Sequence, residues 1–78
     1  EVNFILTRNA NTTVELFDSS GRKICLLEKD QVRAVGENKI FFSINNAKGL
    51  KNGLYFINII AVSENEKIKA ITRLLILR

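Results

Sequence analysis

The apolar residues of this chain come in short runs rich in β-branched and aromatic side chains. Clusters of Gly, Asn, Ser and Asp separate these runs at intervals of about ten residues, which is typical of antiparallel β-proteins. The runs lack the periodicity of an amphipathic helix. The pattern therefore predicts an all-β domain of about six to seven strands, with the clearest strands over Val2–Thr7, Thr12–Asp18, Lys23–Glu28, Asn38–Ile44, Leu54–Val62 and Lys67–Leu77.

The connections carry residues that favour tight turns. Asp18 offers a side-chain acceptor for backbone N–H groups, and Gly21 tolerates positive φ, so this segment predicts a hairpin turn that fixes strand register. Gly36 closes a longer connection, and Gly53 opens the fifth strand. The segment Glu28–Ala34 is too short to persist as a helix without packing, and we expect a loop there.

The strands differ in how many faces are apolar. In Thr12–Asp18, Val14 and Leu16 share one face, while Thr13, Glu15 and Phe17 share the other. The last two strands are apolar on both faces, and such strands need cover on both sides. Two explanations are open: another molecule or domain covers the second face, or the tail curls between the two sheets of a closed sandwich.

Composition limits the chemistry. The 78 residues make one domain, spanning 1–78, with one cysteine and no histidine. No disulfide, no cluster of metal ligands and no usual general base is therefore available, so we expect no enzyme, no metal and no cofactor. The net charge of +4 admits nucleic acid or an acidic polysaccharide as partner. However, the aromatic residues are scattered rather than set among basic residues on one strand, so we expect no nucleic acid as partner. Since we expect no enzyme, we expect no small-molecule substrate either.

The segment Val14–Ile24 resembles the "V-x-L-Y/F-D-x-x-G-R/K-x-V/I" hairpin shared by two related families of bacterial immunoglobulin-like modules. One is the C-terminal sorting domain of the type IX secretion system, and the other is the immunoglobulin-like domain of the flagellar hook-capping protein. Both continue with a glycine in the next loop, here Gly36, and a "G-x-Y-F" strand opening, here Gly53–Phe56. The resemblance implies a small immunoglobulin-like antiparallel β-sandwich.

Two features favour the sorting domain, one departure from the hook-capping pattern and one match. Hook-capping domains usually carry a Trp-Asp-Gly box where this chain has Phe42–Asn45. The finish also matches the sorting domain, with "L-x-x-G-x-Y-F" at Leu50–Phe56, a polar turn at Ser63–Glu66 and a closing apolar strand that ends in a basic residue, Arg78.

The resemblance implies a non-catalytic sorting and cell-surface attachment domain of a larger exported bacterial protein, which is secreted or held at the outer membrane. Its partner would be a protein: the secretion translocon, a neighbouring domain or copies of the chain itself. We expect the recognition surface on the last two strands, with Tyr55 as an aromatic at the rim and basic residues as steering charges. Its residues would be Tyr55, Lys67, Arg73, Leu75, Leu77 and Arg78.

One alternative stays open. The chain could be a structural immunoglobulin-like subunit of an extracellular filament or of a hook-cap-like scaffold, which self-associates through its edge strands.

Overall fold

The computed structural model describes residues 2–41 and 50–77, and all its regular elements are strands. All six expected strands begin within two residues of their predicted starts, and the expected all-β class is confirmed. Four of them also end within one residue of the predicted end, whereas the strand expected over Lys23–Glu28 continues to Arg33. The end of the expected strand Asn38–Ile44 and the segment Phe42–Asn45 lie outside the described residues. The observed strands are β1 (Val2–Leu6), β2 (Ala10–Asp18), β3 (Lys23–Arg33), β4 (Gly36–Ile40), β5 (Gly53–Ser63) and β6 (Glu66–Ile76).

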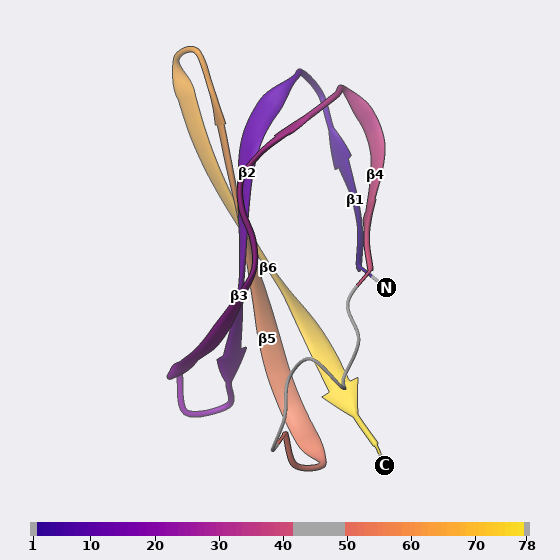
Figure 1. Cartoon of the computed structure of the whole chain (residues 1–78), viewed down its shortest axis with the longest axis vertical. Helices are drawn as coiled ribbons and strands as arrows, with labels where there is room; N and C mark the ends of the chain where they lie inside the picture. Colours follow the sequence, from indigo (N-terminus) through magenta and orange to yellow (C-terminus); the bar gives the residue numbers. More distant parts are fainter. Residues whose placement is uncertain (1, 42–49, 78) are drawn as a thin grey trace.

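The strands form two antiparallel sheets that pack together as a small β-sandwich. One sheet pairs β1 with β4, and the other has the order β3-β2-β5-β6. Figure 1 shows the β1–β4 pair to one side of the larger sheet, while the tip of the long β5–β6 hairpin projects away from it. The smaller sheet is therefore too small to cover the whole of the larger one.

The core lies between the sheets and follows the alternation of β2 and β5. Val14 and Leu16 are fully buried on one face of β2, as the sequence predicts, and Ile57 is opposite Leu16 on β5. A strand places alternate side chains on opposite faces, so every second residue of β5 joins this core. The buried hydrophobic residues that pack together are Val2, Val14, Leu16, Ile40, Leu50, Tyr55, Ile57, Ile59 and Ile76.

The expected loop over Glu28–Ala34 is wrong, because β3 continues to Arg33. The polar sequence of this segment suggested a loop, but its side chains find partners on the neighbouring strand. Thr12 is fully buried, and its hydroxyl donates to Glu28 Oε2 at 2.6 Å. Pairing with β2 is irregular here, with register shifts and a positive φ of 49° at Asp30. A bulged edge strand tolerates such a polar sequence.

A half-buried ion pair within β3 lies against the smaller sheet. Arg33 donates to both carboxylate oxygens of Glu28, from Nε at 2.8 Å and from Nη2 at 2.5 Å. The guanidinium carbon also lies 5.7 Å from the centroid of the Phe4 ring on β1. The hydrogen bond from Arg33 lowers the pKa of Glu28, and that from Thr12 adds to the effect. Glu28 is thus held ionised between Thr12 on β2 and Arg33 on its own strand.

Asp18 organises the turn between β2 and β3. Its Oδ1 accepts hydrogen bonds from the Ser20 hydroxyl at 2.6 Å, from Ser20 N at 2.9 Å and from Arg22 N at 3.0 Å. Gly21 closes the turn at a φ of 90°, which strains any residue with a Cβ. The geometry fits the turn that the sequence predicts at these positions. Gly36 and Gly53 also adopt positive φ, at 110° and 151°.

Acid is expected to weaken this turn. The hydrogen bond from the Ser20 hydroxyl, followed by that from Arg22 N, lowers the pKa of Asp18 from 3.8 to about 2. A carboxyl whose pKa is lower in the folded chain contributes stability above its unfolded pKa, and this contribution is lost as the pH falls through its folded pKa. Urea unfolding should therefore show Asp18→Asn to be less stable than the wild type at pH 6, with a gap that closes near pH 2. A gap that is the same at both pH values would contradict this account.

Candidate functional site

The face of the larger sheet that points away from β1 and β4 has no second layer of described residues over it. We call it the outer face. It is defined by the residues that alternate with the core positions, because successive side chains of a strand point to opposite faces. The outer face consists of Thr13, Glu15 and Phe17 on β2, Leu54, Phe56, Asn58, Ile60 and Val62 on β5, and Lys67, Lys69, Ile71, Arg73 and Leu75 on β6.

Strand register arranges the outer face as two stripes. The middle strand β5 supplies mostly apolar side chains. The neighbouring strand β6 places a cation beside three of them, since Val62 pairs with Lys67, Ile60 with Lys69, and Phe56 with Arg73. An apolar stripe therefore lies next to a basic one along the same hairpin.

Most of β6 is exposed on both of its faces. Every residue from Glu66 to Arg73 is exposed, including Ile71 at 70% on the outer face and Ile68 at 54% on the opposite face. The strand enters the core only at its C-terminal end, where Ile76 is 2% exposed. The end of the strand therefore packs into the sandwich, whereas residues 66–73 are left without cover among the described residues. Cover of this part by another molecule or domain stays a prediction.

The residues expected to recognise a partner fall into three groups. Lys67, Arg73, Leu75 and Leu77 are exposed, the two leucines at 62% and 74%. Tyr55 is not at an exposed rim but in the core, at 7%, because it shares the β5 face of Ile57 and Ile59. Its hydroxyl donates to the carbonyl of Lys51 at 2.7 Å, which satisfies the buried polar group. Arg78 lies outside the described residues.

Sequence reasoning missed several residues of this surface, chiefly Lys69 and Ile71. Both lie on the same face of β6 as Lys67 and Arg73, so counting in steps of two along the strand would have found them. The aromatic contribution comes from Phe17 and Phe56, which pair across β2 and β5, and not from Tyr55.

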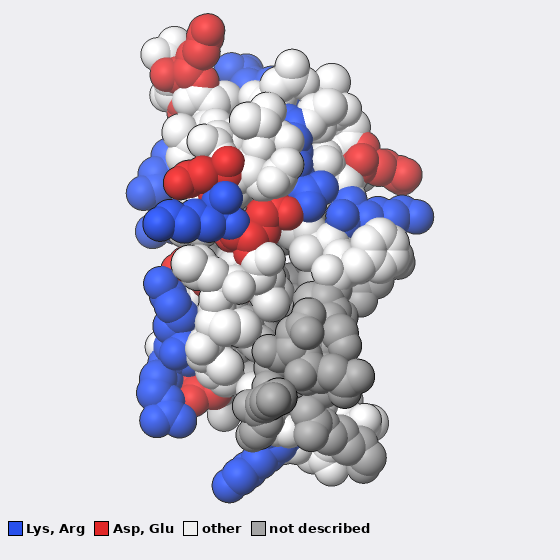
Figure 2. All heavy atoms as spheres, viewed as in Figure 1, with Lys and Arg blue, Asp and Glu red and all other residues white. Residues whose placement is uncertain are grey.

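The cations of β6 form no ion pair with the described acids, although Lys69 contributes to lowering the pKa of Glu15. Glu15, the carboxylate of the outer face, is held by Lys23 on β3 at 2.5 Å, and this contact is the main cause that lowers its pKa. Neither Lys67, Lys69 nor Arg73 forms an ion pair with any residue in ranges 2–41 and 50–77. Figure 2 shows basic side chains along the left margin of the molecule, while most acidic ones lie in the upper half of this view. The surface around β6 is thus free to attract negative charge.

A shallow hollow of about 640 Å³ lies on the outer face beside the β2–β3 turn. Its apolar lining comes from Phe17, Phe56 and Ile71, with Lys69 and the turn residues at its border. It gathers aromatic and aliphatic groups without a cluster of acids or nucleophiles. Such a lining suits the side chains of a protein partner better than catalysis.

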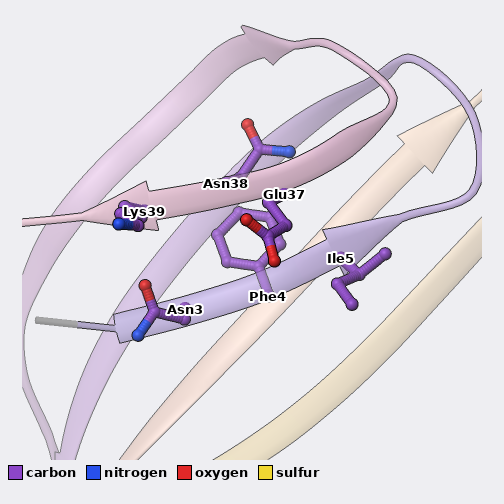
Figure 3. A pocket seen from close by; sticks show the side chains of 6 residues that line it. All are labelled: Asn3, Phe4, Ile5, Glu37, Asn38 and Lys39. Atoms are coloured by element: carbon purple, nitrogen blue, oxygen red, sulfur yellow. The ribbon is translucent and has the colours of Figure 1, made fainter.

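A second hollow, of about 380 Å³, lies at the β1–β4 pair. Figure 3 shows that its residues come from both strands, with the Phe4 ring between them and the carboxylate of Glu37 close to that ring in this view. Its polar groups are a mixture of amides and single charges of opposite sign, from Asn3, Asn38, Glu37 and Lys39. This hollow offers no arrangement that favours one class of ligand.

The described part of the chain lacks two further kinds of feature. No group of His, Cys, Asp and Glu residues there is arranged to hold a metal ion. It also contains no helix long and apolar enough to cross a membrane.

The fold and surface define the class of protein: a small β-sandwich domain whose distinctive feature is an exposed, basic strand at a sheet edge. Comparison with protein families gives a more specific assignment. The family model described as "Secretion system C-terminal sorting domain" matches residues 1–74, and the chain belongs to this family. Comparison with curated proteins and with solved structures finds no match.

Membership of this family decides between the two resemblances of the sequence in favour of the type IX sorting domain. The domain is a C-terminal sorting signal for secretion, and it marks proteins that are secreted to the bacterial cell surface. Interaction with proteins of the secretion machinery is part of that role.

Proposed function

We propose that this domain directs the protein that carries it through the type IX translocon by offering β6 and the outer face as a binding surface, and that it takes part in attachment at the cell surface. It does so by recognition, without catalytic chemistry of its own. The observation that carries the proposal is the exposure of β6 from Glu66 to Arg73 on both faces. A strand that is bare on two faces and one edge is suited to binding by strand addition.

The exposed isoleucines of β6 allow a direct test. A fluorescent reporter is fused upstream of the domain and expressed in a bacterium with a type IX system, and surface-bound and released reporter is measured. Replacing Ile68 and Ile71 by serine should lower reporter export at least about tenfold, because truncating central apolar contacts of an interface often costs that much affinity.

The matched control replaces Ile5 and Val32 by serine. These side chains are 73% and 74% exposed on β1 and β3, so the change in surface polarity is similar. The control should leave export unchanged. Export that is equal for the two variants, or equal with and without the domain, would overturn the proposal. Point variants are preferable to truncation after Thr72, because truncation would also remove Ile76 from the core.

The self-associating subunit has less support, because the charges of β6 disfavour it. If two copies of β6 paired antiparallel about their centres at Ile71, Lys69 of one copy would lie opposite Arg73 of the other on the same face. Like charges opposite each other destabilise a strand pair. Light scattering of the pure chain across concentration distinguishes the two functions, since the sorting domain should remain monomeric and a filament subunit should not.

A further inference from the structure

The two edges of the larger sheet differ in how regularly their edge strands are paired, and therefore in how readily they would accept a further strand. At one edge, pairing of β3 with β2 is interrupted by three register shifts, and Asp30 has a positive φ. Such bulges bend an edge strand and discourage a further strand from pairing with it. At the other edge, β6 pairs with β5 without any shift from Gly53–Ile76 to Ser63–Glu66. The β6 edge is therefore the regular one.

A strand added to the free edge of β6 would meet two different rows of side chains. On the outer face its neighbours would be the cations Lys67, Lys69 and Arg73, with the apolar Ile71 and Leu75 in the same row. On the opposite face, after Glu66, they would be small or mostly apolar: Ile68, Ala70, Thr72 and Leu74. Side chains of paired strands lie about 5 Å apart, close enough for ion pairs on one face and apolar contact on the other.

Lysine on an edge strand is also a common guard against unwanted pairing. On β6 the effect of the cations is selective, because they repel a strand that carries the same charges and attract a strand that carries carboxylates. Among the described acids, Glu15 forms its ion pair with Lys23 and has only a weaker electrostatic interaction with Lys69, and Glu66 faces the other way, opposite Ser63. A partner strand that carries carboxylates would complement the charges of β6.

We propose that the partner supplies a β-strand in which acidic residues alternate with apolar ones, and that this strand adds to the free edge of β6. Its carboxylates pair with Lys67, Lys69 and Arg73 on the outer face, and its apolar residues cover Ile68 and Ala70. This inference rests on the proposed function, since it names the chemistry of the partner at the same surface.

Peptides test the inference on the purified chain. Three peptides of about ten residues with capped termini are compared. The first alternates Glu and Val, and the second alternates Lys and Val. The third has the composition of the first, but all its Glu residues precede all its Val residues. The alternating Glu peptide should bind about tenfold more tightly than either control at low salt, from three exposed ion pairs of about twofold each. The preference should shrink as salt is added. Hydrogen exchange should show new protection at β6 and not at β3.

Charge reversal completes the test. Replacing Lys67, Lys69 and Arg73 by Glu should abolish the preference for the Glu peptide, whereas the matched variant with Arg8, Lys29 and Lys39 replaced by Glu should keep it. Circular dichroism checks that both variants fold. Equal binding of all three peptides, or protection at β3, would overturn the inference.

Reporter export separates this inference from the proposed function. If the wild-type domain exports the reporter and the β6 charge-reversal variant exports it equally well, the acidic partner is wrong and the sorting function stands. If the wild-type domain exports no reporter, the sorting function fails whatever the peptides do. Loss of export in the β6 variant but not in the matched one supports both.

Discussion

Replacing Arg33 by alanine is expected to lower the free energy of unfolding by about 3 kcal/mol. The change leaves the Glu28 carboxylate without its bidentate partner in a site where only 12% of its side chain is exposed. A buried charge that loses its partner is costly, because water cannot replace the lost hydrogen bonds. The contact with Phe4 is lost as well. Urea denaturation followed by circular dichroism measures the effect.

The chain contains its own control for this prediction. Arg22 also pairs with an acid a few residues away, Asp18, but its side chain is 83% exposed. Arg22→Ala should therefore change stability far less, since exposed ion pairs contribute roughly 0 to 1 kcal/mol. If the two alanine variants are equally stable, the half-buried ion pair within β3 contributes no more to stability than the exposed pair of Arg22.

Leu16→Ala is expected to cost about 3 kcal/mol or more, because it removes a fully buried side chain from the centre of the core and leaves a cavity. The matched variant is Ile71→Ala, which removes a similar apolar side chain that is 70% exposed on the outer face. We expect it to change stability by at most about 0.5 kcal/mol. The difference is measurable as the shift in urea midpoint between the two variants.

A large effect of Ile71→Ala would contradict the view that the outer face is uncovered. It would mean that Ile71 is buried in solution, by another part of the chain or by a second copy. The comparison therefore tests the core and the exposed surface together.

The sequence allowed prediction of the strands whose faces alternate clearly. Val14 and Leu16 point into the core as their spacing indicates, and the turn at Asp18 lies where its residue types favour one. These features depend on local preferences and on a period of two, which can be counted along the chain. Recognition of the sorting family likewise used short local motifs, and the family match confirms it.

Features that depend on contacts between distant strands were harder to predict. Nothing local in Glu28–Arg33 distinguishes a polar edge strand from a loop, because the partner that orders it is Thr12, on another strand. The position of Tyr55 had the same difficulty: β5 is apolar on both faces, so only its register with β2 decides that Tyr55 is buried and Phe56 lies on the outer face.

The candidate site was predicted in part for the same reason. Lys67 and Arg73 were found from their charge near the end of the chain, and both are exposed. The stripe that they form with Lys69 needs the register of β6 on β5, and the openness of this edge needs the strand order of the whole sheet.

The order of strands also has a consequence for how the chain folds. β5 and β6 are joined by a two-residue turn, so their hairpin forms from local contacts, on a timescale of about 1–10 μs. The pairing of β1 with β4 brings Val2 to Ile40 and requires a much longer loop to close. We therefore expect the β6 edge to form before the sandwich closes. The surface that a partner would bind would then exist before the domain is fully folded.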